Sequence, residues 1–199
     1  KVEMTNETEG PNRPDRRPGI AICTYDGDSG WDLVEDLSGE AWSPPGARTI
    51  RVSMGDPDAL ADTLGADLKD GRCRAVLLVG RTHKGAAFRI QMRAENRALD
   101  RKDRLSVTGP GLARTTAPVA DILRALHASG LPAEASSEAE DDAGSYLLYR
   151  ILADLDDGPH TPAVGLLRSP ASADETAVKK AVKAAASIMA GHMALSPRT

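Results

Sequence analysis

Residues 141–149 of this 199-residue chain read Asp-Asp-Ala-Gly-Ser-Tyr-Leu-Leu-Tyr, and this stretch is the most informative one for the fold. Two adjacent acids precede a run without proline, and acids at the start of a helix are stabilised by its dipole. A helix is predicted over residues 143–155, with Leu147, Leu148 and Ile151 on its apolar side. The stretch therefore predicts a helix that begins next to a pair of carboxylates and buries its leucines.

Short apolar runs lie on both sides of this helix. The strongest strand pattern is Ala-Val-Leu-Leu-Val at residues 75–79, and Gly80 is predicted to end it. Residues 88–92 alternate apolar and polar side chains, which predicts a hairpin or a sheet edge. Further strands are predicted over residues 20–24, 48–53, 131–136 and 163–167.

Helix signals lie between these strands. Asp56 is predicted to cap a helix that has Pro57 at its first position. Pro118 is predicted to begin another helix, which Gly130 ends. Residues 172–175, Ser-Ala-Asp-Glu, have the pattern of a capping box in front of the final helix. Strands separated by helices of these lengths predict a sheet covered by helices on both faces.

The stretch 141–149 resembles the helix-opening motif of the pyroglutamyl peptidases (pyrrolidone carboxyl peptidases), a family of cysteine peptidases. In that family the motif runs Ala-Gly-x-Tyr, an apolar residue, Cys and Asn, and the Cys is the nucleophile. Leu148 stands at the position of the Cys, and Tyr149 at the position of the Asn. A thiolate is needed to attack an amide carbonyl, and leucine offers none. The resemblance implies a peptidase fold without its nucleophile.

Two further stretches resemble signatures of the same family and lack its catalytic groups. One signature of the family has a glycine at a strand end, then a Gly-rich loop, then a strand that reaches Glu-Arg-x-Ala-x-Asn. Residues 80–96 follow this spacing, but Gln91 replaces the Glu. Residues 165–170, Gly-Leu-Leu-Arg-Ser-Pro, resemble the signature that carries the general base, but Arg168 replaces its His. The resemblance therefore extends to the three positions of the catalytic triad, all of them altered.

The amino-terminal signature of the family, Gly-Phe-x-Pro-Phe-Gly after a strand, corresponds to residues 24–29. Tyr25 keeps an aromatic ring there, and Asp28 places a charge where the family has a second ring. With this signature the resemblance covers about residues 19–190, by order and spacing more than by identity. It implies a three-layer α/β/α sandwich with a mixed, mostly parallel central sheet, and it implies self-association, because members of the family are commonly homo-oligomers.

The triad positions Gln91, Leu148 and Arg168 cannot perform the family's chemistry. Leucine has no lone pair with which to attack, and an arginine that stays protonated cannot accept a proton. The leading hypothesis is therefore a non-catalytic relative, a pseudoenzyme that acts as a structural or interaction subunit. The alternative is a diverged hydrolase or a binder of anionic small molecules that uses the old cleft, with Tyr25, His83, Gln91 and Arg168 as ligand-binding candidates.

Each candidate also has a structural interpretation. For Arg168, an ion pair with Asp141, Asp142 or another acid is favoured over recognition of a carboxylate ligand. Gln91 is expected to bond buried backbone groups, since an unpaired buried amide is costly. His83 follows the strand at 75–79, a place where α/β proteins bind ligands, so it is the histidine to test first.

Composition agrees with one globular domain. Hydrophobic residues make up 41% and charged residues 27%, but aromatic residues only 3%, so Ala, Leu, Val and Ile must build the core. The net charge of −4 argues against a dedicated nucleic-acid binder. No apolar run approaches the length of a membrane span. Cys23 and Cys73 are interpreted as small buried hydrophobic residues, and no metal or cofactor is expected.

Three segments are expected: a polar arm over residues 1–18, the peptidase-like domain over 19–191 and a tail over 192–199. The arm is rich in proline and charge and has no periodic apolar residues. It cannot bury itself, so it is expected to lie on a neighbouring subunit or a partner. Since the chain begins at Lys1 without a signal segment, we expect a cytoplasmic protein, or one of an organelle matrix after removal of a presequence.

Overall fold

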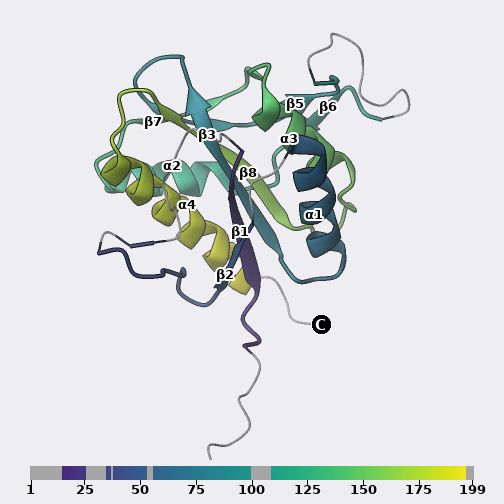
Figure 1. The fold of residues 1–199 in the computed structure, drawn as a ribbon, viewed down its shortest axis with the longest axis horizontal. Coiled ribbons are helices and arrows are strands. Elements are labelled where there is room, and N and C mark those ends of the chain that lie inside the picture. The colour runs from purple at the N-terminus through teal and green to yellow at the C-terminus, as the bar shows by residue number, and fades with distance from the viewer. Residues whose placement is uncertain (1–14, 26–34, 37, 53–55, 100–108, 196–199) are drawn as a thin grey trace, which may run out of the picture.

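The computed structural model describes residues 15–25, 35–36, 38–52, 56–99 and 109–195. A six-stranded sheet forms the middle layer, and two helices cover each of its faces (Figure 1). Helices α1 (Pro57–Lys69) and α3 (Ala143–Ala153) pack together on one face. Helices α2 (Val119–Ala128) and α4 (Glu175–Leu195) pack together on the other. The expected α/β/α sandwich is confirmed.

The strands of the sheet run in the order β2-β1-β3-β8-β4-β7. All neighbours are parallel except β4 and β8, which are antiparallel. The sheet is therefore mixed and mostly parallel, as expected. Its strands are β1 (Gly19–Thr24), β2 (Arg48–Arg51), β3 (Ala75–Thr82), β4 (Phe88–Gln91), β7 (Ala133–Ser136) and β8 (Ala163–Pro170).

Two strand predictions need correction. Strand β4 was predicted as a hairpin or an edge, but it lies inside the sheet between β8 and β7. Its alternation has another cause: Phe88 and Ile90 face α2 and α4, while Gln91 belongs to a buried polar cluster on the opposite face. Strand β3 does not end at Gly80 but continues to Thr82. A two-stranded ribbon, β5 (Arg93–Glu95) and β6 (Leu112–Arg114), packs on α3 and was not predicted.

The helix ends follow local capping chemistry. Asp56 accepts hydrogen bonds from the backbone N–H groups of Asp58 and Ala59, which confirms the predicted cap of α1. The predicted capping box in front of α4 is wrong at its first position. Asp174, not Ser172, accepts the bond from the N–H of Ala177, 2.8 Å away. Aspartate caps as well as serine does, so the nearer acid takes the position.

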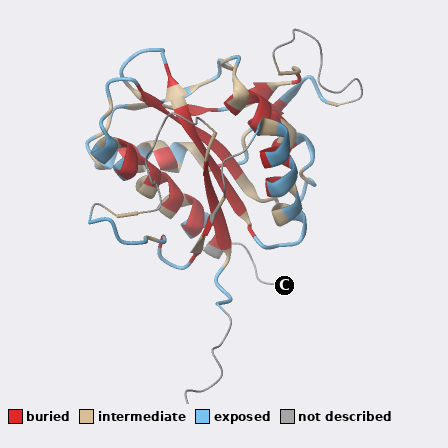
Figure 2. Ribbon diagram, in the orientation of Figure 1, coloured by how far each residue is buried: buried red, intermediate tan, exposed pale blue. Residues whose placement is uncertain are grey.

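The core consists of two apolar clusters, one on each face of the sheet, and the buried residues concentrate along the central strands and the inner sides of the helices (Figure 2). Few aromatic residues take part: Phe88, Tyr146 and Tyr149 are the buried ones among the described residues. The alanine face of α4 lies directly on the sheet, which lets this long helix pack closely. The expectation of a core built from small aliphatic residues is confirmed.

Candidate functional site

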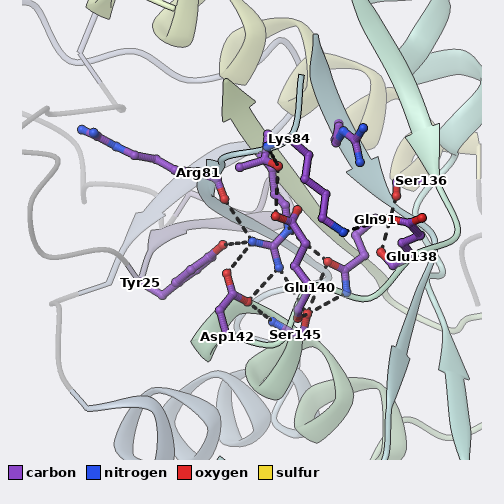
Figure 3. Close-up of polar contacts among 12 residues, drawn as sticks. Tyr25, Arg81, Lys84, Gln91, Ser136, Glu138, Glu140, Asp142 and Ser145 are labelled. Atoms are coloured by element: carbon purple, nitrogen blue, oxygen red, sulfur yellow. Dashed lines mark hydrogen bonds and ion pairs between the residues drawn. The ribbon is translucent and has the colours of Figure 1, made fainter. Parts of the chain in front are cut away.

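Two of the altered triad positions, Gln91 and Arg168, lie together near the ends of β3 and β8 and the start of α3. Arg168 is on β8, Gln91 is the last residue of β4, and Tyr25 follows β1. Figure 3 shows the side chains of Tyr25, Gln91, Asp142 and Ser145 converging on one point. The fold therefore brings together three of the four ligand-binding candidates that the sequence suggested.

Arg168 is the centre of this cluster, and its side chain is only 1% exposed. Nη1 donates to Asp142 Oδ2 at 2.6 Å, and Nη2 donates to Asp142 Oδ1 at 2.8 Å, which makes a bidentate ion pair. Nε lies 3.0 Å from Gln91 Oε1 and 3.2 Å from Glu140 Oε2. The expected structural pair between Arg168 and an acid is confirmed, with Asp142 as the main partner.

The remaining donors of Arg168 are also occupied. Nη1 lies 3.0 Å from the hydroxyl of Tyr25 and 3.1 Å from the carbonyl of Arg81, and Nη2 lies 3.2 Å from Ser145 Oγ. A guanidinium has five N–H groups, one on Nε and two on each terminal nitrogen. Each nitrogen has at least as many acceptors as it has hydrogens. The arginine has no donor left for a ligand.

Electrostatics hold Arg168 in its charged form. Burial by itself lowers the pKa of Arg168, but the hydrogen bonds and charge of Asp142, together with Tyr25 and Glu140, outweigh this and raise the pKa above its usual value. Two carboxylates therefore surround one cation. A group that keeps its proton at every accessible pH cannot act as a general base.

Gln91 is 1% exposed and is tied into the same cluster. Its amide nitrogen donates to the carbonyl of Arg93 and to Ser145 Oγ, each at 2.9 Å, while its oxygen accepts from Arg168. Ser145 in turn donates to the carbonyl of Glu140. The expectation that Gln91 bonds buried backbone groups is confirmed for Arg93. The amide crosslinks β4 to the start of α3.

Tyr25 fills the space that two glycines leave open. A Cβ atom added at Gly80 or at Gly144 would overlap the phenol ring. Gly80 lies within β3 and Gly144 in the first turn of α3, so the ring lies between the sheet and that helix. The glycine inside β3 is thus explained by close approach of the ring, not by the end of the strand.

Leu148 is fully buried and belongs to the apolar cluster that α1 and α3 form with the sheet. Tyr149 is buried as well, and its hydroxyl donates to the carbonyl of Pro110 at 2.7 Å. Both residues are therefore packing residues, which confirms the prediction that Leu148 lies on the apolar side of the helix.

His83 is exposed on the loop after β3 and does not join the cluster. Its neighbour Lys84 pairs with Glu138 at 2.8 Å. Thr82 Oγ1 donates to Glu140 Oε1 at 3.0 Å, which fixes the second acid of the cluster. Neither Glu140 nor Ser145 was predicted to join Arg168, because an acid in a loop carries no pattern of its own and a serine after Gly144 only faintly resembles a nucleophile elbow.

The described residues offer no metal site, since they hold no group of three or more His, Cys, Asp or Glu arranged to bind an ion. Both cysteines are buried, as expected. Burial raises the pKa of Cys23 to about 11, and burial with the nearby Asp67 and Asp70 raises that of Cys73 to about 12. Neither thiol is ready to act as a nucleophile. No helix in the described part of the chain has the length and apolar character that crossing a membrane requires.

The layered sheet defines an α/β/α sandwich, and comparison with solved structures shows that the chain has the fold of pyroglutamyl peptidase I. It superimposes on that enzyme from Bacillus amyloliquefaciens with a TM-score of 0.73 and 20% identity, over 89% of this chain and 97% of the other. No protein-family model and no curated protein matches the chain.

Two further structures agree. A mutant pyrrolidone carboxyl peptidase from Pyrococcus furiosus gives a TM-score of 0.72 at 16% identity, over 87% of this chain and 99% of the other. The enzyme from Thermus thermophilus gives 0.62 at 17% identity, over 85% and 99%. The resemblance inferred from the motifs is thus confirmed at the level of the fold, over nearly the whole length of both chains.

Proposed function

We propose that this chain is a pseudoenzyme: a protein with the pyroglutamyl peptidase fold that has no peptidase activity and serves as a structural or interaction subunit of an assembly. The observation that carries the proposal is the saturated Arg168. A buried, permanently charged guanidinium occupies the position that the motif resemblance assigns to the general base, and Asp142, Glu140, Gln91, Ser145 and Tyr25 take its donors.

The chemistry at the other two triad positions supports the same conclusion. Leu148, at the position of the nucleophile, lies in the apolar core. Gln91, at the position of the acid, is neutral and bonds to Arg168 where an orienting carboxylate would bond to a histidine. Catalytic triads act as a unit, and the loss of one member typically costs several orders of magnitude in rate. Here all three members are replaced.

The alternative function, binding of an anionic small molecule in the old cleft, has less support. A ligand carboxylate would have to displace Asp142, which holds Arg168 through two short bonds and also caps α3 by accepting from the N–H of Ser145. The hollow next to the cluster, which Glu140, Asp142, Ser145 and Tyr146 help to line, has a volume of only about 20 Å³. Ligand pockets usually measure several hundred Å³.

A thermal-shift series separates these two functions. Pyroglutamate, a pyroglutamyl dipeptide and short carboxylates are added to the purified full chain at concentrations up to tens of millimolar. The pseudoenzyme proposal expects no shift beyond that of sodium chloride at equal ionic strength. A saturable rise in Tm that Gln91→Ala abolishes would favour the binder instead.

The interaction role is tested by the state of assembly. We expect light scattering after size exclusion, or native mass spectrometry, to show an oligomer of the full chain, and limited proteolysis to remove residues 1–18 more slowly from the oligomer than from dissociated protein. A monomer at all concentrations, whose arm is cleaved at the same rate alone and with candidate partners, would refute the role as a subunit without restoring catalysis.

A further inference from the structure

A second polar hollow lies at the opposite end of the sheet, where β3 and β8 begin. The first residues of these strands, Ala75 and Ala163, are paired in register. The hollow has a volume of about 130 Å³ and is lined in part by Arg74, His160 and His192. The Arg168 cluster lies near the other ends of the same two strands, so the two sites share no residue.

The charge of this hollow is unusual for the chain. Its lining holds one arginine and two histidines and, among the described residues, no carboxylate, although the whole chain has a net charge of −4. One lining histidine contacts an acid outside the hollow, since Asp121 Oδ2 lies 2.8 Å from His192 Nε2. Asp121 also pairs with Arg124, so its charge is already balanced. The described lining therefore offers an anion one permanently cationic side chain, Arg74, and no carboxylate of its own.

Arg74 is the group in the hollow best able to hold an anion. Its backbone is fixed, because its N–H donates to the carbonyl of Gly19 at 2.8 Å and its carbonyl accepts from the N–H of Ala163 at 3.2 Å. Its partly buried side chain has no hydrogen bond or ion pair to any residue that the structure describes. This is the reverse of Arg168, whose donors are all used. A free, planar guanidinium matches the paired oxygens of an oxyanion.

The volume decides the size of the ligand. A water molecule takes about 30 Å³ of liquid, and drug-sized ligands need about 300 Å³ or more. A hollow of about 130 Å³ is less than half the size that a drug-sized ligand needs, which suits an ion of a few heavy atoms. We propose that the hollow formed by Arg74, His160 and His192 is a binding site for a small oxyanion of the phosphate class.

The proposal is tested by titrating the ¹⁵N-labelled full chain with inorganic phosphate at pH 7, with ionic strength held constant by sodium chloride. We expect saturable amide shifts centred on residues 74, 161 and 192, with a dissociation constant of about 1 mM or a few-fold above it, because the hollow is open to water. Sulfate should compete for the same site, and acetate should bind more weakly. Shifts that do not saturate, or that map elsewhere, would overturn the proposal.

Two variants and one control make the test decisive. Arg74→Gln should weaken phosphate binding about tenfold or more, since a hydrogen bond to a charged group is lost. Arg114→Gln, at an exposed position of β6, should change it less than about twofold because charge alone is not the cause. If Arg74→Gln does not fold, His160→Gln decides the matter, since His160 is exposed. Unchanged affinity in that variant would contradict the proposal.

Discussion

Replacement of Arg168 by methionine gives the most informative test of the cluster. The change keeps the bulk of the side chain and removes its charge, leaving Asp142 and Glu140 without their shared cation. Removing one partner of a buried ion pair costs about 3–5 kcal/mol. Because the Asp142 side chain is 37% exposed, water compensates part of this loss, so we expect the lower end, about 3 kcal/mol.

The assay is urea unfolding followed by circular dichroism, with a thermal scan beside it. For a chain of this length, about 3 kcal/mol corresponds to a fall in Tm of roughly 6–12 °C.

Asp142→Asn is the matched partner, because asparagine still caps α3 but carries no charge. The double variant should lose less than the sum of the single losses, since both remove the same contact. The exposed Arg114→Met serves as a control and should stay within about 0.5 kcal/mol of the wild type. An Arg168→Met protein within about 1 kcal/mol of the wild type, or losses that add, would refute the reasoning.

Three smaller tests concern other parts of the fold. Gly144→Ala should destabilise the protein by about 1–3 kcal/mol because its methyl overlaps the Tyr25 ring. In a Tyr25→Ala background the same change should stabilise by up to about 1 kcal/mol through helix propensity. Calorimetry that shows a change in stability of the same sign in both backgrounds would contradict this. Asp174→Ala should cost about 1 kcal/mol in urea unfolding and Ser172→Ala less than about 0.5 kcal/mol, whereas the reverse order would restore the capping box. Because the folded pKa of Cys73 is raised to about 12 from an ordinary 9.0, its contribution to stability is complete below pH 9 and declines above it. The free energy of unfolding of the wild type should fall by about 1.4 kcal/mol at pH 10 through Cys73, and the Cys73→Ala variant should lack this part of the fall. If the free energy of unfolding of both proteins changes equally with pH, Cys73 makes no such contribution.

Much of the fold was predictable because local chemistry and tertiary packing agree. Asp56 and Pro57 mark the start of α1, and the apolar run at 75–79 forms the centre of β3. Pro118 and Gly130 bracket α2, and Gly130 adopts the positive φ that a helix end requires. In these segments the same residues determine both the local conformation and the buried face.

The failures have a different origin, because they depend on contacts between distant residues. Gly80 looked like a strand end, but it is a place where Tyr25 approaches the backbone of β3. His192 was expected beyond the last helix, but α4 continues to Leu195 and the histidine bonds Asp121 on α2. Strand β4 alternates because one of its faces meets the core and the other a polar cluster, which no single strand reveals.

The sequence predicted some members of the candidate site, but neither all of them nor the bonds that join them. The motif resemblance pointed to Gln91, Leu148 and Arg168, and charge made an acid the natural partner of the arginine. Sequence alone could not show that Glu140 and Ser145 complete the cluster. Glu140 reaches it from the loop before α3, and Ser145 reaches it from the first turn of that helix. Nor could the sequence show that His83 stays outside the cluster, exposed on the loop after β3.

The most direct measurement of the central claim is turnover of a fluorogenic pyroglutamyl amide by the purified full chain. Enzymes typically turn over at about 1–1,000 s⁻¹, and replacement of a whole triad should lower this by at least about four orders of magnitude. We therefore predict no release of fluorophore above that of an Arg168→Met preparation purified in parallel. Sustained turnover near 1 s⁻¹ that co-elutes with the wild-type chain and is absent from the variant would contradict the account.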